Sequence, residues 1–394
     1  ATGFAGRLTA LYLQDTYGDD LRWAVAGRSQ DKLDALVAEL AARRPDAPPV
    51  PSLTADSSDL PSLRAMAAQT DVVITTVGPY AKYGLPMVEA CADEGTHYAD
   101  LTGEPPFIRR SIDGFHEKAR QTGARIAHCC GFDSEPSDLG AFLVQKVAIE
   151  ALGAPCDEVE FVLWWAKGGF SGGTLASALN ILEEAKDDRQ VRRVMADPYS
   201  LCSEGGPDDR EQMGVRYSEA GGVWTGPFFM AAVNEKVVRR SNELLAHRYG
   251  RDFRYGESLR TGRGTRARLR ALGMAAGMGV GVAALSVGPI RRLVGRRATQ
   301  PGDGPSEEAI EAGGFEARLF GWKDGEVAVE VRVKGDRDPG YGATACMLAE
   351  TGLGLARHDD LGPAGVTTPA AALGQALIDR LDPRQVHFEV VRPG

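Results

Sequence analysis

The chain has 394 residues, of which 45 are lysine or arginine and 54 are aspartate or glutamate, giving a formal net charge of −9 at pH 7. Hydrophobic residues make up 43% and charged residues 25%, a composition that excludes a disordered or fibrous chain. The length suits two domains, and the acidic balance argues against binding to nucleic acid.

The cysteines and the first residues bear on the compartment. The six cysteines form no CxxC pair, and no cluster of histidine and cysteine has the spacing of a zinc site. Residues 1–13 have neither a basic start nor an unbroken apolar stretch, so no secretory signal is expected. We therefore expect a cytoplasmic protein without a bound metal.

A glycine-rich turn opens the chain and leads into a helix, through Thr2, Gly3, Phe4 and Gly6. In a dinucleotide-binding βαβ unit, such a turn follows a buried strand and an earlier glycine, which we expect before residue 1. Gly3 would let a pyrophosphate approach the helix N-terminus, and Gly6 would let the helix pack closely on the sheet.

A second strand is predicted at 21–26, and it ends in Gly27, Arg28 and Ser29 before a helix that carries Lys32. An NAD-binding protein has a carboxylate at this position for the ribose hydroxyls, and here it is absent. Arg28 can instead pair with a 2′-phosphate, with Ser29 and Lys32 as further donors, so NADP is preferred. The alternative is that Arg28 is a solvated loop residue.

Strands and helices then alternate along the chain. Strands are predicted at 50–56, which ends in Asp56, and at 72–77, 97–101 and 125–129, with helices at 60–68, 85–94 and 112–121. This order predicts an α/β fold with a Rossmann-like, doubly wound parallel sheet over residues 1–150. Ligands of such sheets bind at the carboxyl ends of the strands.

The unusual residues of this domain follow its strands. Val77, Gly78 and Pro79 would form a loop beside the nicotinamide ribose, and Gly131, Phe132 and Asp133 would complete the cofactor site. Carboxylates and phenols reach the same rim: Asp100 and Glu104, with Tyr83, as candidate substrate residues, and Tyr80 and Tyr98 as candidate proton donors near a hydride acceptor. The alternatives are that Asp133 caps the next helix and that Asp100 binds loop backbone.

The pattern changes after about residue 156. A strand is predicted at 159–165, a helix from 172 to about 184, and a hairpin of strands 315–322 and 326–333 around Lys323, Asp324 and Gly325. We predict a second, α+β domain with antiparallel sheet at 151–340. Helices near 343–355 and 369–381, with a final strand, would return over 341–394 to the first domain.

Residues 271–290 contain no charged side chain and have arginines on both sides. The length suits a membrane span, but glycine and alanine supply half of the residues, and glycines recur at 273, 277 and 281. Three alternatives remain open: a hairpin on or in the inner face of the cell membrane, a buried or homodimer-contact helix, and a flap over an acyl channel. The basic flanks would attract anionic lipid head groups.

Motifs spread over the chain carry a family resemblance. Residues 1–6, 26–33, 77–80 with Gly84, 131–134, 234–241, 335–341 and 367–369 resemble the saccharopine dehydrogenase-like oxidoreductases, and within them the trans-acting enoyl reductases of mycobacteria. The resemblance implies a reductase that uses NADPH to reduce a carbon–carbon double bond of an acyl chain made by a polyketide synthase. The hydrophobic acyl substrate would be carried by a synthase or a lipid.

Two other functions stay open. A saccharopine-reductase-like enzyme would reduce a carbon–nitrogen bond, and its substrates need clustered arginine or lysine, whereas the predicted rim is acidic and phenolic. A membrane-associated scaffold would bind nucleotide without turnover.

Overall fold

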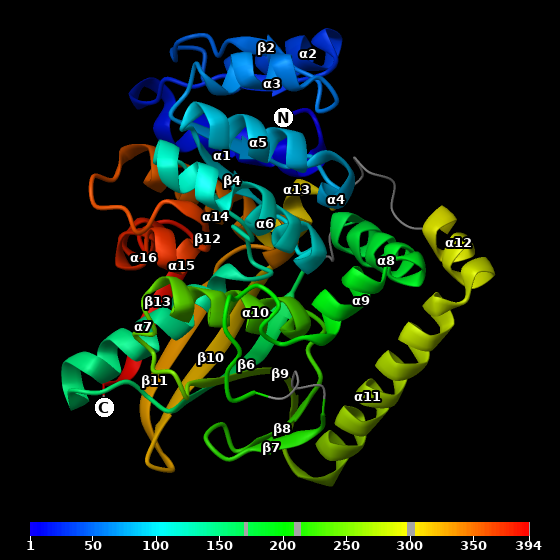
Figure 1. Cartoon of the computed structure of the whole chain (residues 1–394), viewed down its shortest axis with the longest axis vertical. Coiled ribbons are helices and arrows are strands. Elements are labelled where there is room, and N and C mark those ends of the chain that lie inside the picture. The colour runs from blue at the N-terminus through cyan, green and yellow to red at the C-terminus, as the bar shows by residue number, and fades with distance from the viewer. Residues whose placement is uncertain (169–171, 209–213, 298–303, 394) are drawn as a thin grey trace.

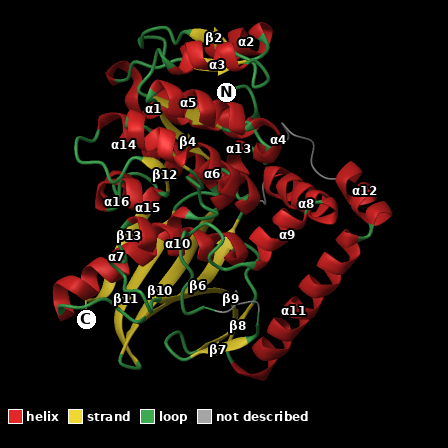
Figure 2. Ribbon diagram, in the orientation of Figure 1, coloured by secondary structure: helices red, strands yellow, loops and turns green. Residues whose placement is uncertain are grey.

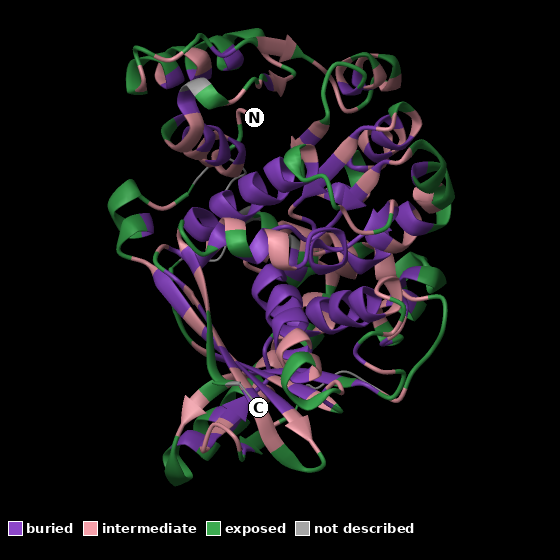
Figure 3. Ribbon diagram, turned by 90° about the vertical axis from the view of Figure 1, so that its left-hand side faces the viewer, coloured by how far each residue is buried: buried purple, intermediate pink, exposed green. Residues whose placement is uncertain are grey.

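Two groups of strands organise the molecule (Figures 1 and 2). The structure, a computed structural model, describes residues 1–168, 172–208, 214–297 and 304–393. The upper part in Figure 1 contains short parallel strands, and the lower part contains one larger sheet. Figure 3 shows that buried residues concentrate in the helices and strands where the two parts meet.

The first part is the predicted Rossmann-like domain. Its strands are β1 (Val25–Gly27), β2 (Ser52–Thr54), β3 (Val72–Thr75), β4 (His97–Asp100), β5 (Arg125–Ala127) and β12 (Gly365–Thr367). They form two parallel sheets with the orders β1-β2 and β12-β5-β4-β3. The helices of this part are α1 (Phe4–Tyr17), α2 (Gln30–Arg43), α3 (Leu60–Ala67), α4 (Tyr80–Tyr83), α5 (Leu85–Glu94), α6 (Pro105–Thr122) and α14 (Thr344–Arg357). The α/β fold class is confirmed.

The second part is a mixed sheet of seven strands in the order β13-β11-β10-β6-β9-β8-β7. The strands are β6 (Glu158–Lys167), β7 (Arg216–Ser218), β8 (Val223–Gly226), β9 (Arg254–Gly262), β10 (Gly314–Lys323), β11 (Glu326–Gly335) and β13 (Val386–Pro393). Only the β6–β9 pair is parallel. The hairpin of β10 and β11 is confirmed, and Asp324 and Gly325 turn it with positive φ angles of 50° and 83°.

Helices join the two parts. α7 (Glu135–Leu152) begins just beyond β5 and packs on β10 and β11, while α10 (Ala231–Leu244) packs on β9. A Cβ on Gly140 of α7 would lie 2.8 Å from Leu319 Cδ1, so the absence of a side chain lets the helix approach the sheet. The loop after β5 is thereby held at the junction of both domains.

Two domain boundaries and one helix differ from the prediction. The last strand, β13, pairs with β11 of the second sheet instead of returning to the first domain. α7 packs on the second sheet although the predicted domain border lies at residue 150. The helix predicted at 369–381 is two helices, α15 (Pro369–Ala372) and α16 (Gln375–Leu381), because Gly374 adopts a φ of +50°. Contacts between elements that are distant in sequence decide the domain boundaries, and local sequence patterns do not show such contacts.

The apolar segment forms α11 (Gly264–Ser286), followed by α12 (Gly288–Arg297). By length and composition alone, α11 could cross a membrane, and only 6% of its apolar window is buried. The interpretation as a buried helix is therefore wrong. The segment is also one continuous helix over 264–286, not a hairpin within that range. Contact with a membrane, a second copy or an acyl chain stays a prediction.

Buried carboxylates at the start of α7 make stability depend on pH. Burial raises the pKa of Glu135 to about 8 and that of Asp138 to about 7. Thr351 donates to Glu135 at 2.5 Å, and Ser241 donates to Asp138. The folded protein therefore keeps a proton on Glu135 between pH 4.5 and about 8, whereas the unfolded chain releases it.

From this sign we expect Glu135 to favour folding most at low pH and to lose that contribution as the pH rises towards 8. The unfolding temperature of the Glu135→Gln variant should change less steeply between pH 5.5 and 8 than that of the parent chain. His97 and His116, whose pKa values burial lowers, act with the opposite sign in both proteins and cancel in this comparison. Glu150→Gln, at an exposed position of α7, is the control, and an identical slope in all three proteins would contradict the assignment.

Candidate cofactor and substrate site

The first residues lie against the end of β1. The amino group of Ala1 donates to the carbonyl of Ala26 at 2.6 Å, and Thr2 Cγ2 lies 3.8 Å from where a Cβ of Gly27 would be. Gly3 is the N-cap of α1, and no side chain caps that helix end. A Cβ on Gly3 would meet no atom within 4 Å, so there is open space beside the uncapped end of α1.

Gly6 brings α1 against the loop after β3. A Cβ at this position would lie 2.8 Å from Thr76 Oγ1 and 2.7 Å from the Ala1 carbonyl oxygen, closer than real contacts allow. Gly6 therefore lets α1 pack closely against Thr76, directly after β3. It places the exposed residues Val77 and Gly78 near the start of α1.

Charged side chains follow the carboxyl ends of β1 and β2. Arg28 and Lys32 are exposed, and Ser29 is the N-cap of α2 without a side-chain cap bond. Asp56 follows β2 and accepts from the backbone N–H and the hydroxyl of Ser58. These bonds, with a smaller contribution from the charge of Arg28, hold the pKa of Asp56 below its usual value. Arg28 and Asp56 thus belong to one corner of the domain.

Residues after β5 pack against a segment that the sequence did not indicate. The N–H of Phe132 donates to Thr344 Oγ1 at 3.1 Å, and its ring contacts Phe315 edge-on at 4.6 Å. A Cβ on Gly131 would lie 2.8 Å from Leu101 Cδ2. The ring of Phe4, at the start of α1, lies edge-on to Tyr341 at 4.8 Å. The segment 338–344 thus touches both the first turn of α1 and the loop after β5.

Capping was the alternative to a cofactor role for Asp133, and Asp133 is not the N-cap residue of α7. The N-cap of α7 is Ser134, whose hydroxyl donates to Asn234 of α10 at 2.8 Å. Asp133 is half-buried beside it. Pro79 precedes α4 as its N-cap residue and is also half-buried.

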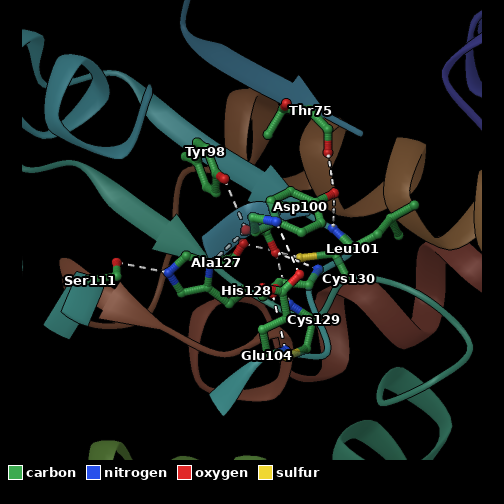
Figure 4. Close-up of polar contacts among 12 residues, drawn as sticks. Thr75, Tyr98, Asp100, Leu101, Glu104, Ser111, Ala127, His128, Cys129 and Cys130 are labelled. Carbon is green, nitrogen blue, oxygen red and sulfur yellow. Dashed lines mark hydrogen bonds and ion pairs between the residues drawn. The ribbon is translucent and has the colours of Figure 1, made fainter. Parts of the chain in front are cut away.

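Asp100 is the centre of a buried polar network (Figure 4). One carboxylate oxygen accepts from the N–H groups of Thr102 and Cys129 at 3.0 and 3.2 Å. The other accepts from the Tyr98 hydroxyl at 2.9 Å and lies 2.8 Å from His128 Nδ1. Asp100 is fully buried, so the expectation of substrate contact is corrected: this carboxylate joins the ends of β4 and β5.

Glu104 is likewise fully buried and organises the neighbouring loop. Its carboxylate accepts from the N–H groups of Tyr80 and Ala81 at 3.0 and 2.9 Å, and from the hydroxyl of Ser177 at 2.7 Å. Ser177 belongs to α8 (Gly172–Asp187), which follows the second sheet's strand β6. Glu104 therefore ties the loop after β3 to the second domain and does not reach the surface as a substrate residue.

The three phenols differ in exposure. Tyr98 is fully buried, and Tyr80 is 5% exposed, with its hydroxyl donating to the Thr75 carbonyl and accepting from the Leu101 N–H. Burial raises the pKa of both phenols well above the usual value. Tyr83, on α4, is 45% exposed. Of these three phenols, Tyr83 alone has substantial contact with solvent.

Replacing Glu104 with glutamine tests this link between the domains. The amide keeps one acceptor oxygen and places an NH₂ group against backbone N–H donors, which costs about 1–3 kcal/mol of folding free energy. We expect a lower unfolding temperature and weaker NADPH binding, because the Gly78–Pro79 loop loses its anchor. Glu94→Gln, exposed at the end of α5, is the matched control. If both variants behaved like the parent chain, Glu104 would have no positioning role.

These residues fit NADP(H). An uncapped helix end beside a glycine with free space suits a pyrophosphate, and the exposed Arg28 suits a 2′-phosphate. Gly78 and Pro79 follow β3 at the same end of the domain. Of the predicted cofactor residues, the structure thus brings Thr2, Gly3, Gly6 and Gly27 together, with Arg28 directly after Gly27 and with Val77 directly after Thr76, which lies against Gly6.

Comparison with known proteins supports this interpretation. A family model described as the saccharopine dehydrogenase NADP binding domain matches residues 1–126, and the cofactor is NADP(H). The yeast saccharopine dehydrogenase (L-Glu forming) has the same fold over 98% of both chains, with a TM-score of 0.52 and 13% identity. That likeness concerns the fold alone.

Several mycobacterial proteins match this chain over almost its full length. The Mycobacterium tuberculosis protein Rv2449c is 44% identical over all of this chain and 96% of its own length. The trans-acting enoyl reductases of Mycobacterium bovis and Mycobacterium ulcerans are 40% and 39% identical, each over 97% of this chain and 94% of the relative. The chain therefore belongs to the trans-acting enoyl reductase family of saccharopine dehydrogenase-like, NADP-dependent oxidoreductases.

Proposed function

We propose that this protein reduces a carbon–carbon double bond in the acyl chain of a polyketide or lipid, with NADPH as the electron donor. The observation that carries the proposal is the match to trans-acting enoyl reductases over almost the whole length of the chain, and the glycine-rich start of α1 beside Gly27 supports it. The word trans-acting in the relatives' names supports a substrate that is presented by a separate synthase.

The chain's own residues bind and orient in this reaction. The start of α1 and Arg28 would hold the phosphate groups, and Val77, Gly78 and Pro79 would flank the nicotinamide. NADPH would supply a hydride for the β carbon of the enoyl group, and the α carbon would receive a proton. Asp100 and Glu104 act as positioning residues because both carboxylates are buried and hydrogen-bonded.

The exposure of the three tyrosines decides which of them can act as the proton donor. Tyr80 and Tyr98 are enclosed, so they serve the loop and the strand ends, and they do not reach an acyl chain. Tyr83 has an exposed phenol one turn beyond Pro79. We assign the proton to Tyr83 or to a water molecule at that place.

The Tyr83→Phe variant separates these donors. If the phenol supplies the proton, kcat should fall by about 100-fold or more, with a small change in KM, since general acids contribute that much. Tyr217→Phe, at a phenol 44% exposed on β7, controls for loss of a surface hydroxyl. An unchanged kcat would exclude Tyr83 and leave water as the donor, without affecting the assignment of enoyl reduction.

The test of function is NADPH oxidation with two substrate classes. Enoyl thioesters of increasing chain length should give turnover and a saturated product. A mixture of an amino acid and a keto acid, which supplies an imine, should give none. Since Asp100 and Glu104 are buried, acidic groups at the rim no longer argue against carboxylate-rich substrates, and this comparison must decide. Turnover with the imine alone would overturn the proposal, and NADPH binding without turnover would favour the scaffold.

A further inference from the structure

The long helix α11 presents apolar side chains to solvent. Leu269, Leu272 and Val280 are 62%, 48% and 69% exposed. At 100° per residue, these three side chains fall within roughly 80° of the helix circumference, so they form one face. In α11 only Ala267 and Ala271 are buried, both in its first third. A row of exposed aliphatic residues of this kind marks an interaction surface.

The charge around this face has one sign. Residues 258–302 contain nine arginines and no aspartate, glutamate, lysine or histidine. This segment is therefore strongly positive, although the whole chain has a net charge of −9. Five of the arginines precede or begin α11 and are exposed: Arg260, Arg263, Arg266, Arg268 and Arg270. In the described part of the chain, none of these five forms an ion pair with a carboxylate. The occupant of the apolar face must therefore tolerate or prefer positive charge.

Both ends of α11 are attached to the body of the molecule (Figure 1). Its first turns pack on β8 and β9, with Arg268 stacked 5.0 Å from the ring centre of Trp224. At the other end, α12 contacts α8, and Arg291 pairs with Glu183. A helix held at both ends on the same side of a protein does not cross a bilayer, but it can lie along a surface with its full length of about 35 Å.

We propose that α11 docks lengthwise on the surface of a membrane that contains anionic phospholipid. Leu269, Leu272 and Val280 enter the boundary of the acyl chains, and the arginines at the start of the helix bind the head groups. Charge excludes a second copy as the favoured occupant, because the arginines at 260–270 and 291–297 put like charges together in both parallel and antiparallel pairs. The inference does not depend on the proposed enzymatic function.

The experiment is sedimentation of the full chain with vesicles of phosphatidylcholine, with and without 30% or more phosphatidylglycerol. We expect binding that requires phosphatidylglycerol and weakens as salt rises. Val280→Glu should weaken it by about tenfold or more, since a charge replaces an inserted aliphatic side chain. Leu152→Glu, at a side chain 43% exposed on α7, should bind as the parent does.

A variant that binds the vesicles more tightly than the parent shows that the loss in Val280→Glu is not caused by misfolding. Val280→Trp should bind the same vesicles more tightly, because tryptophan favours the membrane interface. Equal sedimentation with both vesicle types, or equal loss in the Leu152 and Val280 variants, would overturn the proposal. It would also be overturned if no vesicle bound and the chain instead formed a dimer that Val280→Glu dissociates.

Discussion

Replacing Arg28 with alanine is expected to weaken NADPH binding by about 10- to 100-fold and to leave NADH binding nearly unchanged, as loss of a charge-assisted bond to a phosphate would do. Arg28 is exposed, it follows β1, and the only feature that distinguishes the two nucleotides is the 2′-phosphate. Fluorescence titration of both nucleotides measures the change.

Arg22→Ala is the matched control for this prediction, because Arg22 is equally exposed and precedes the same strand. It should keep the parent's preference for NADPH. The two variants could instead reduce the affinity for NADPH and for NADH by the same factor. Arg28 would then act only through the overall electrostatic potential of the protein, without a direct bond to the 2′-phosphate. The interpretation of Arg28 as a solvated loop residue would then hold.

Replacing Asp100 with alanine is expected to destabilise the first domain by about 4 kcal/mol or more, the largest effect on folding that we predict. The substitution leaves two buried backbone N–H groups, those of Thr102 and Cys129, without their acceptor. A backbone N–H cannot become an acceptor, so neither group can adapt.

Asp100→Asn should cost less than Asp100→Ala. Its amide oxygen can still accept from both backbone N–H groups, and its NH₂ can donate to the Tyr98 oxygen and to His128 Nδ1, since both can exchange donor for acceptor. Chemical denaturation measures the order of the variants. Asp113→Ala, at a surface ion pair with Arg109, should cost less than about 1 kcal/mol. Equal stability of all the variants would contradict the structural role of Asp100.

Local sequence patterns predicted most helices and strands, because these elements depend on interactions between residues that are close in sequence. The apolar run at 72–77 indicated a buried strand, and β3 lies there; alternation around Asp324 and Gly325 indicated the hairpin, and β10 and β11 form it. Partners distant in sequence were not predictable in the same way. The residues of β13 do not show which of the sheets it joins. In the structure it pairs with the edge strand β11 of the second sheet.

For the candidate site, the sequence indicated the backbone better than the side chains. Gly3 has free space at the start of α1, and Gly6 allows α1 to pack closely against Thr76. The predicted acidic rim is wrong because the carboxylates at the end of β4 are enclosed by the packing of the two domains. β4 is buried on both faces at its carboxyl end, because Tyr98, Ala99 and Asp100 are all 0% exposed.

The partner of Glu104 is 73 residues away, and no sequence signal joins Ser177 to it. Tyr341 and Thr344 were also missed as neighbours of the site, although residues 335–341 contributed to the family resemblance. Contacts between domains of this kind require the three-dimensional structure.

The measurement that tests the central claim most directly is isotope transfer to an enoyl thioester. With NADPH deuterated at the transferred position of C4, and separately with unlabelled NADPH in D₂O, the saturated product would be examined by mass spectrometry and NMR. We expect deuterated NADPH to place one deuterium on the β carbon. In D₂O with unlabelled NADPH, we expect one deuterium on the α carbon. Label on the nitrogen-bearing carbon of an amine product, with no reduction of the enoyl chain, would contradict the proposed enoyl reduction.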